Sequence, residues 1–381
     1  MKDRVAVIGV GCTKFGERYD RGYEELICDA AFAAYEDAGV DPTAIEAGYL
    51  GTYLPGPGGG KSATSLADAL RLYGRPITRV ENYCATGTDA FRNACLAVAA
   101  GVHDIVLVIG AEKLKDRGGR GIPRLGHPLL ARGNTAPGLF ALAANRYMHT
   151  FGLGRETLAK VAVKNHANGA KNEKAHLRSE ITVEQVLKAP IIAWPFGLFD
   201  CCPTTDGAAA AIVCRPELAK RFRKPAILVK AAALAVETGK PYFDPTFDYL
   251  GFRSTQKAAQ AAYTMAGITP RDIDFAEVHD CFTWTEISNT EDLGFCAKGE
   301  GGSLAEEGRT ALDGDIPINP SGGLKSFGHP IGASGVRMIY EVVTQLRGEA
   351  GARQVKNPRL GLAHNVGGPG AVSCVVVLGN A

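Results

Sequence analysis

The chain has 381 residues, with 46% hydrophobic and 22% charged residues, so it is long enough for several cores and has the composition of a folded globular protein. Its 42 Lys and Arg nearly balance its 40 Asp and Glu, which leaves a formal net charge of +2. A charge this small argues against roles that depend on attraction to nucleic acid or to an anionic membrane. We therefore expect no nucleic-acid partner and no membrane partner.

The apolar runs, the N-terminus and the cysteines indicate in which cellular compartment the protein works. The longest apolar runs, such as residues 105–109 and 375–378, are far shorter than the roughly 20 residues of a membrane-spanning helix. The N-terminus leads at once into an apolar pattern at residues 5–9, without the features of a signal peptide. Ten cysteines in a chain of this length do not make a disulfide scaffold. We expect a cytoplasmic protein.

Strand patterns and helix patterns alternate from the N-terminus. Residues 5–8 predict a strand and residues 24–38 a helix, and residues 88–100 predict a second helix before a strand at residues 105–109. Such alternation is typical of α/β layers.

One segment recurs at an offset of 228 residues. Residues 30–45 read AAFAAYEDAGVDPTAI and residues 258–273 read AAQAAYTMAGITPRDI. Both copies predict an Ala-rich helix that ends at a Gly, followed by a Pro that cannot continue it and then by a strand. We therefore expect a duplicated fold with halves at about 1–220 and 225–381. The longer first half predicts a loop domain inserted at about 115–200.

Cys84 lies in the first half, between a short strand pattern and an apolar helix pattern. At such a turn the unpaired N–H groups and the dipole of the helix favour a thiolate. The plain alternative is a buried cysteine with no chemical role, which is common.

His279 and Cys281 follow the strand pattern of residues 275–278 in the second half. Side chains two positions apart in an extended chain point the same way, so both can face one site. A metal site is the other possibility, and two ligands without closely spaced companions make it weak.

Two further segments contain residues suited to catalysis. His329 lies in a Gly/Pro-rich turn before the helix pattern of residues 336–346, where an imidazole can accept a proton from a thiol. Residues 362–370 predict a Gly-rich turn between two strands, whose N–H groups can hold an oxyanion. A surface histidine and an ordinary tight turn are the plain alternatives.

Together these segments resemble the thiolase superfamily and, within it, thiolases of the sterol carrier protein X type. The resemblance extends over nearly the whole chain and implies a layered α-β-α-β-α fold of two similar five-stranded halves, with a loop domain inserted in the first. It rests on Cys84-Ala85-Thr86-Gly87, Lys164-Asn165-His166, residues 201–212, His279-Asp280-Cys281-Phe282, Gly328-His329-Pro330 and His364-Asn365.

The resemblance implies a role for each candidate residue. Cys84 becomes acylated after His329 takes its proton, and Cys281 transfers protons to the leaving group and from the incoming one. His279 and His329 stabilise the oxyanion, and the backbone N–H groups of Cys84 and Gly367 hold the thioester oxygen. Biosynthetic thiolases have a catalytic cysteine where this chain has Asn365 and an asparagine where it has His279, so the roles of His364 and Asn365 stay open.

The function implied by the resemblance is CoA-dependent thiolytic cleavage of a 3-oxoacyl-CoA. Benzoylsuccinyl-CoA, which would give benzoyl-CoA and succinyl-CoA, is one candidate substrate. CoA is then a substrate, and no metal is expected in this chain. Expected partners are a second copy, in a homodimer, and a small zinc-binding OB-fold subunit. Two alternatives stay open: a thiolase-like aldolase or lyase that acts on an acyl-CoA, and a non-catalytic acyl-CoA-binding subunit.

A run of basic residues precedes the predicted insertion. It could supply counter-charge to the phosphates of CoA, or it could be an ordinary solvated loop. The run consists of Lys113, Lys115, Arg117, Arg120 and Arg124.

Overall fold

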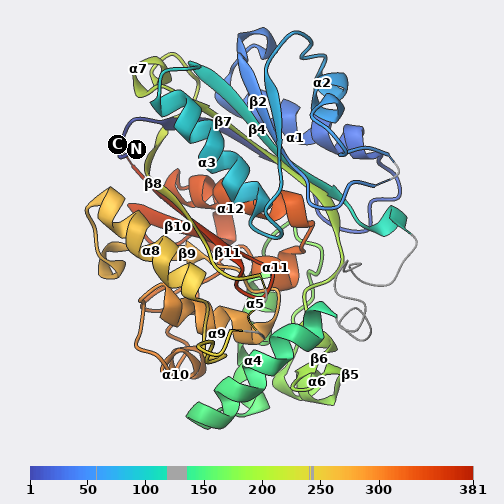
Figure 1. The fold of residues 1–381 in the computed structure, drawn as a ribbon, viewed down its shortest axis with the longest axis vertical. Coiled ribbons are helices and arrows are strands. Elements are labelled where there is room, and N and C mark those ends of the chain that lie inside the picture. The colour runs from blue at the N-terminus through green and yellow to red at the C-terminus, as the bar shows by residue number, and fades with distance from the viewer. Residues whose placement is uncertain (57, 118–134, 240, 242–243, 381) are drawn as a thin grey trace.

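The computed structural model describes residues 1–56, 58–117, 135–239, 241 and 244–380. Nine strands form one mixed sheet in the order β3-β2-β4-β7-β1-β8-β11-β10-β9 (Figure 1). The first half of the chain supplies β1 (Ala6–Cys12), β2 (Ala47–Gly51), β3 (Ile77–Val80), β4 (Ile105–Lys113) and β7 (Asp206–Cys214), and the second supplies β8 (Ile227–Val236), β9 (Phe275–Glu277), β10 (Leu360–Gly367) and β11 (Val372–Gly379).

The strand connections of the first half recur in the second. β1 pairs antiparallel with β7, β7 pairs antiparallel with β4, and β4 pairs parallel with β2. In the same order, β8, β11, β10 and β9 make two antiparallel pairs and one parallel pair. In place of a strand equivalent to β3, the second half has a single parallel bridge between Ala276 of β9 and Ile318. The duplicated α/β fold is therefore confirmed, while the boundary near 220–225 stays a prediction.

The repeated sequence forms the same local structure twice. α1 (Tyr23–Ala38) ends at Gly39 and α8 (Arg253–Ala266) ends at Gly267, with φ angles of 66° and 67°. Glycine adopts this left-handed conformation without steric cost, and each Gly stops its helix. A short 3-10 turn that begins at Pro42 or Pro270 then leads into β2 or β9.

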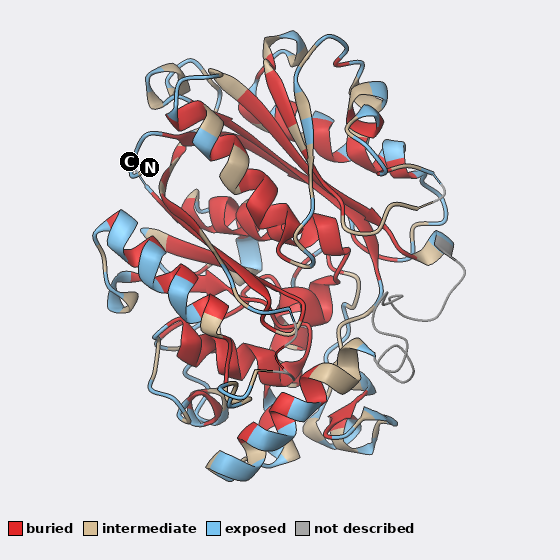
Figure 2. Ribbon diagram, in the orientation of Figure 1, coloured by how far each residue is buried: buried red, intermediate tan, exposed pale blue. Residues whose placement is uncertain are grey.

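The helices and the two halves of the sheet form five layers. α1 packs on β1 and β7 at one side of the molecule, and α8 packs on β8 and β11 at the other. Between them, α3 (Thr86–Ala99) and α12 (Ile331–Leu346) contact each other and strands of both halves. Figure 2 shows that α12 is buried along nearly its whole length. This order is the α-β-α-β-α layering that was predicted.

Glycines let the two central helices approach each other closely. A Cβ atom on Gly87 of α3 would lie 2.7 Å from the carbonyl oxygen of Gly332, and one on Gly335 of α12 would lie 2.8 Å from the carbonyl carbon of Gly87. This contact holds the start of α3, next to Cys84, against the start of α12, next to His329.

We expect Gly87→Ala to lower the free energy of unfolding by about 1–3 kcal/mol, because the added methyl overpacks this contact. Denaturant unfolding measures the change. Gly16→Ala is the matched control, since a Cβ there meets nothing within 4 Å, and it should change stability by no more than about 0.5 kcal/mol. Equal stability of the two variants would contradict the close packing of α3 and α12.

The predicted insertion lies between β4 and β7. Its described part is mainly helical, and residues 118–134 lie outside the described residues. It contains α4 (Ala136–Phe151), α5 (Arg155–Ala170), α6 (Val183–Lys188) and a hairpin of β5 (Ile191–Ala193) and β6 (Phe196–Gly197). The remaining helices are α2 (Thr64–Leu70), α7 (Pro216–Ala219), α9 (Thr283–Asp292), α10 (Gly301–Glu306) and α11 (Gly323–Phe327). Within the described ranges, no helix is long and apolar enough to cross a membrane.

Two boundaries differ from the sequence expectation. α12 begins at Ile331, five residues before the predicted start at residue 336. β10 continues to Gly367, so His364 and Asn365 lie in a strand and not in the predicted Gly-rich turn. Pairing with β11, which sets Asn365 opposite Cys374, overrides the turn preference of the local sequence.

Candidate active site

Cys84 lies in a tight turn directly before α3, as predicted. Within the turn, the N–H of Ala85 donates to the carbonyl of Asn82 (3.1 Å) and that of Thr86 to the carbonyl of Tyr83 (3.2 Å). The hydroxyl of Thr86 accepts from the N–H of Asn82 at 2.8 Å and closes the turn. Tyr83 has a φ of 50°, which is unusual for a bulky residue and is often found at functional sites.

The fold brings Cys84, His279 and His329 together from three segments. One ligand-type atom of each lies within 4.8 Å of those of the other two. The two imidazole rings meet edge to face, with centroids 5.2 Å apart and an angle of 84° between their planes. Three of the predicted catalytic residues thus form one cluster.

The hydrogen bonds of His329 fix its tautomer. Its Nδ1 lies 2.7 Å from the hydroxyl of Ser334, and that hydroxyl donates its hydrogen to the carbonyl of Pro330 at 3.0 Å. The hydroxyl must therefore accept a hydrogen from Nδ1, which leaves the lone pair of the ring on Nε2. This Nε2 is buried and has no hydrogen-bond partner among the described residues. His329 can accept a proton there.

Both histidines are neutral at physiological pH. Burial lowers the pKa of His329 to about 3, and the nearby positive charge of Arg337 also lowers it. Burial lowers the pKa of His279 well below its ordinary value, and the neighbouring His329, His364 and Arg337 add to this. A neutral imidazole is the form that accepts a proton from a thiol.

Cys281 lies next to this cluster, in the loop between β9 and α9. Burial raises the pKa of its thiol well above the ordinary value, and the neighbouring Cys202 and Cys84 raise it further. The side chain is 5% exposed, and its sulfur lies 4.0 Å from the hydroxyl of Thr285. Such a thiol is protonated at rest and becomes a strong base once it has lost its proton.

Asp280 anchors the segment that carries His279 and Cys281. Its carboxylate accepts from the backbone N–H groups of Leu324 (2.6 Å) and Lys325 (3.2 Å) at the start of α11. It also accepts from the side-chain amide of Asn165 at 2.8 Å. Because α11 leads directly to His329, these bonds position both histidine segments together.

The end of β10 lies against the turn that carries Cys84. A Cβ on Gly367 would lie 2.7 Å from the carbonyl oxygen of Asn82 and 2.9 Å from Cβ of Tyr83. Gly367 therefore lies beside the nucleophile segment, as its predicted role in holding an oxyanion requires. The direction of its N–H toward a substrate stays a prediction.

The two polar residues of β10 point to opposite sides of the sheet. His364 faces α8, where its Nε2 lies 3.1 Å from the hydroxyl of Thr255. Asn365 faces the central helices, with its side-chain nitrogen 3.4 Å from Nδ1 of His279. Only Asn365 thus contacts the cluster directly.

Sequence reasoning missed Ser334. The residue stands five positions after His329 in a segment that was expected to be a turn, because the predicted helix began at residue 336. A helix beginning at Ile331 would have placed Ser334 in its first turn, where a hydroxyl can face a preceding side chain. A correct prediction of where α12 begins could therefore have identified Ser334, but the predicted start lay five residues too far along the chain.

Part of the predicted basic run is already paired. The ammonium of Lys113 contacts Asp116 at 2.7 Å and Asp206 at 2.9 Å, and Lys115 contacts Glu17. Lys113 is buried. Arg120 and Arg124 lie outside the described residues. The structure thus gives no support to Lys113 as a phosphate ligand.

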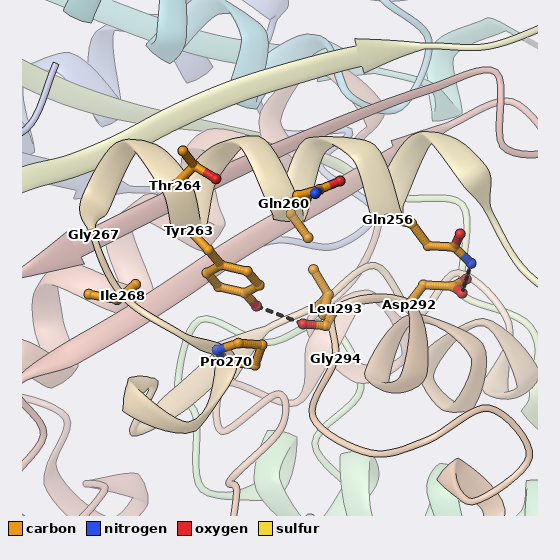
Figure 3. Close-up of a pocket in the computed structure, with 11 residues that line it drawn as sticks. Gln256, Gln260, Tyr263, Thr264, Gly267, Ile268, Pro270, Asp292, Leu293 and Gly294 are labelled. Atoms are coloured by element: carbon orange, nitrogen blue, oxygen red, sulfur yellow. Dashed lines mark hydrogen bonds between the residues drawn. The ribbon is translucent and has the colours of Figure 1, made fainter.

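A separate groove of about 370 Å³ lies between α8 and the segment after α9 (Figure 3). None of the cluster residues lines it. Two pairs of its polar groups are bonded to each other: the hydroxyl of Tyr263 donates to the carbonyl of Leu293, and the amide of Gln256 to Asp292. No cysteine or histidine lines the groove, so the cluster around Cys84 is the better candidate for the active site.

Comparisons with known proteins agree with this geometry. Residues 5–193 match the family model "Thiolase, N-terminal domain", and residues 240–380 match "Thiolase C-terminal domain-like". An "Acetyl-CoA acetyltransferase" of Methanothermobacter thermautotrophicus is 44% identical over 98% of this chain and 99% of its own. "Benzoylsuccinyl-CoA thiolase subunit BbsB" of Thauera aromatica is 34% identical over 97% of this chain and 96% of its own.

Two further proteins are similar over nearly the whole of this chain, one in sequence and one in fold. Human "Sterol carrier protein 2" is 33% identical over 97% of this chain and 71% of its own length. The solved "Ltp2-ChsH2(DUF35) aldolase" has a TM-score of 0.88 at 27% identity, and the match covers 100% of this chain and 98% of that one.

Proposed function

The chain belongs to the thiolase family, and on this premise we propose that it cleaves a 3-oxoacyl-CoA with CoA, through an acyl group carried on Cys84. The observation that carries the proposal is the cluster of Cys84, His279 and His329. In it, Nε2 of each histidine is buried and has no partner in the described part of the chain. A nucleophile, a base and an oxyanion donor are the groups that acyl transfer needs.

The first half-reaction forms the acyl-enzyme. His329 takes the proton of Cys84 on Nε2, and the sulfur forms a bond to the 3-oxo carbon of the substrate. The oxygen of that carbon becomes negative and is stabilised by His279. The bond between C2 and C3 then breaks, its electron pair goes to the departing acyl-CoA enolate, and Cys281 protonates that enolate.

The second half-reaction releases the acyl group. The thiolate of Cys281 takes the proton of incoming CoA, and the CoA sulfur attacks the thioester carbon on Cys84. The backbone N–H groups of Cys84 and Gly367 hold the thioester oxygen. Cys84 leaves and recovers its proton from His329, so each group returns to its starting state. The high pKa of Cys281 makes its thiolate a sufficient base for CoA.

We expect that the acylation rate does not fall as the pH is lowered through 6.5, the ordinary pKa of histidine. Since the pKa of His329 is about 3, the ring is fully neutral above roughly pH 4, and it loses its function as a base only as the pH falls through about 3. Single-turnover acylation followed from pH 5 to 8 measures this. A limb near pH 6.5 that moves or disappears in His329→Gln would contradict a neutral, buried His329.

Two substrates follow from the relatives. The Methanothermobacter relative, at 44% identity, is named an acetyl-CoA acetyltransferase, which favours acetoacetyl-CoA and a two-carbon acyl group. The subunit of benzoylsuccinyl-CoA thiolase, at 34% identity, keeps benzoylsuccinyl-CoA as the second candidate. Consumption of CoA thiol in proportion to each substrate decides between them. If the protein, alone and with its small partner subunit, neither consumes CoA with these or longer 3-oxoacyl-CoAs nor cleaves them, the chain is an acyl-CoA-binding subunit and not a thiolase.

The aldolase neighbour supports a second candidate function. At a TM-score of 0.88 its fold is very similar to that of this chain. A carbon–carbon lyase would cleave an acyl-CoA without adding CoA and without an acyl-enzyme. The cluster of Cys84 with two neutral histidines favours the thiolase, because a lyase reaction of this kind would leave the thiol without a role.

We further propose that the chain works in an assembly. β3 forms one edge of the sheet and is only partly buried, so it can pair with β3 of a second copy in a homodimer. The names of the aldolase, which includes a DUF35 component, and of the BbsB subunit support a small additional subunit. That this subunit is a zinc-binding OB-fold protein, that this chain needs no metal and that the protein is cytoplasmic stay predictions.

A further inference from the structure

The family resemblance implies no role for Asn365. The contacts of its side chain indicate one. It lies on β10, fully buried, between α3 and α12. Its side-chain nitrogen lies 3.1 Å from the sulfur of Met338, and its oxygen lies 3.3 Å from the hydroxyl of Thr88. The same nitrogen lies 3.4 Å from Nδ1 of His279.

These contacts fix the orientation of the amide. A thioether sulfur has no hydrogen to donate, so the group of Asn365 that faces Met338 is the NH₂ group. The hydroxyl of Thr88 donates to the carbonyl of Ala85 at 2.9 Å and more weakly to the oxygen of Asn365 at 3.3 Å, so the assignment depends on the contact with Met338. The NH₂ group has two hydrogens, and the second points to Nδ1 of His279. Nδ1 must therefore be the unprotonated nitrogen of this neutral ring, and Nε2 carries the hydrogen.

The two catalytic histidines thus have opposite tautomers. Ser334 holds the hydrogen of His329 on Nδ1, so Nε2 of His329 is a base. Asn365 holds the hydrogen of His279 on Nε2, so this atom is a donor without a partner among the described residues. One ring can take the proton of Cys84 while the other donates to the oxyanion.

We propose that Asn365 is a positioning residue, which acts through His279 by holding it in the tautomer that donates from Nε2. The proposal rests on the proposed thiolase reaction, because the oxyanion is formed there. Gly335 makes the arrangement possible: a Cβ at this position would lie 2.5 Å from the side-chain oxygen of Asn365. The central helices therefore leave space for the amide.

The tautomer can be observed without substrate. In protein labelled with ¹⁵N-histidine, the chemical shifts of the two ring nitrogens show which one carries the hydrogen, and His279→Gln identifies the signals among the eight histidines. We expect Nε2 of His279 to be protonated in the resting enzyme. In Asn365→Leu the ring should lose this preference. In Asn365→Asp a carboxylate replaces the donor, so Nδ1 should become protonated.

Kinetics test the consequence. Loss of one oxyanion donor costs about a hundredfold in kcat, so Asn365→Leu should lower kcat by about this factor and change KM far less. Asn145→Leu is the control for loss of an amide, because Asn145 lies on α4 and donates to the carbonyls of Ala141 and Trp194; it should keep both the tautomer and the turnover.

Three results would overturn the proposal. One is a hydrogen on Nδ1 of His279 in the resting enzyme, and another is normal turnover in Asn365→Leu. The third is a loss of turnover in Asn365→Leu while His279 keeps its tautomer, which would make Asn365 structural only. Failure of the thiolase reaction itself is seen separately, as the absence of an acyl group on Cys84 in the wild-type protein.

Discussion

Cys84→Ala is expected to abolish thiolytic turnover, with a loss of about 10⁴-fold or more. The cluster contains one sulfur nucleophile. The two neutral histidines beside it act as a base and as a hydrogen-bond donor, and neither can replace the thiol as the nucleophile. The variant should keep its thermal stability, since Cys84 is only partly buried in a turn whose backbone hydrogen bonds do not use the sulfur. Steady-state consumption of CoA thiol measures the loss.

The matched control is Cys28→Ala, because Cys28 is also partly buried and lies on α1, away from the cluster. It should retain full turnover. If Cys84→Ala still cleaves an acyl-CoA without consuming CoA, the aldolase becomes the better description. Equal loss in both variants would show that removal of a thiol harms the fold and not the chemistry.

Cys281→Ala is expected to lower turnover by about 10²–10⁴-fold, the range for loss of a general acid and base. Both half-reactions depend on this thiol: the first needs its proton for the enolate, and the second needs its thiolate for CoA. The deacylation step should recover as the pH rises above about 8.5, the pKa of the ordinary cysteine thiol, because the alkyl thiol of CoA then increasingly ionises without help. Single-turnover release of the acyl group at several pH values tests this.

Cys202→Ala is the control for this experiment. Cys202 is a partly buried residue beside Cys281, and its backbone N–H donates to the carbonyl of Cys281 at 2.9 Å. This bond does not involve the sulfur, so the variant should keep most of its turnover. A large loss in Cys202→Ala together with a small one in Cys281→Ala would move the acid and base role to Cys202.

Much of the fold could be predicted from local sequence. The repeat at 30–45 and 258–273 predicted two helices that stop at Gly39 and Gly267, and both helices end there in a left-handed glycine. Local signals are sufficient in these segments because the stop depends on a glycine and a proline within a few residues. The order of the strands in the sheet could not be predicted in this way, since it depends on pairing between distant segments.

The site was predicted in part. Cys84, His279 and His329 do converge, but this depended on the resemblance to a family, because no local pattern brings together residues so far apart. Ser334 and the role of Asn365 were not predicted. Each acts through one hydrogen bond whose partner is fixed by the start of α12 or by the alternation of β10, and both boundaries differed from the sequence expectation.

The most direct test of the account is peptide mass mapping after a brief quench of the enzyme with acetoacetyl-CoA, with benzoylsuccinyl-CoA and with a series of other 3-oxoacyl-CoAs. We expect an acyl mass on the peptide that contains Cys84, removed by added CoA and absent from Cys84→Ala. The size of the acyl group will identify the retained half of the substrate. Turnover of any of these substrates with the acyl group on another residue, or with no acyl group on the protein, would contradict the acyl-enzyme on Cys84.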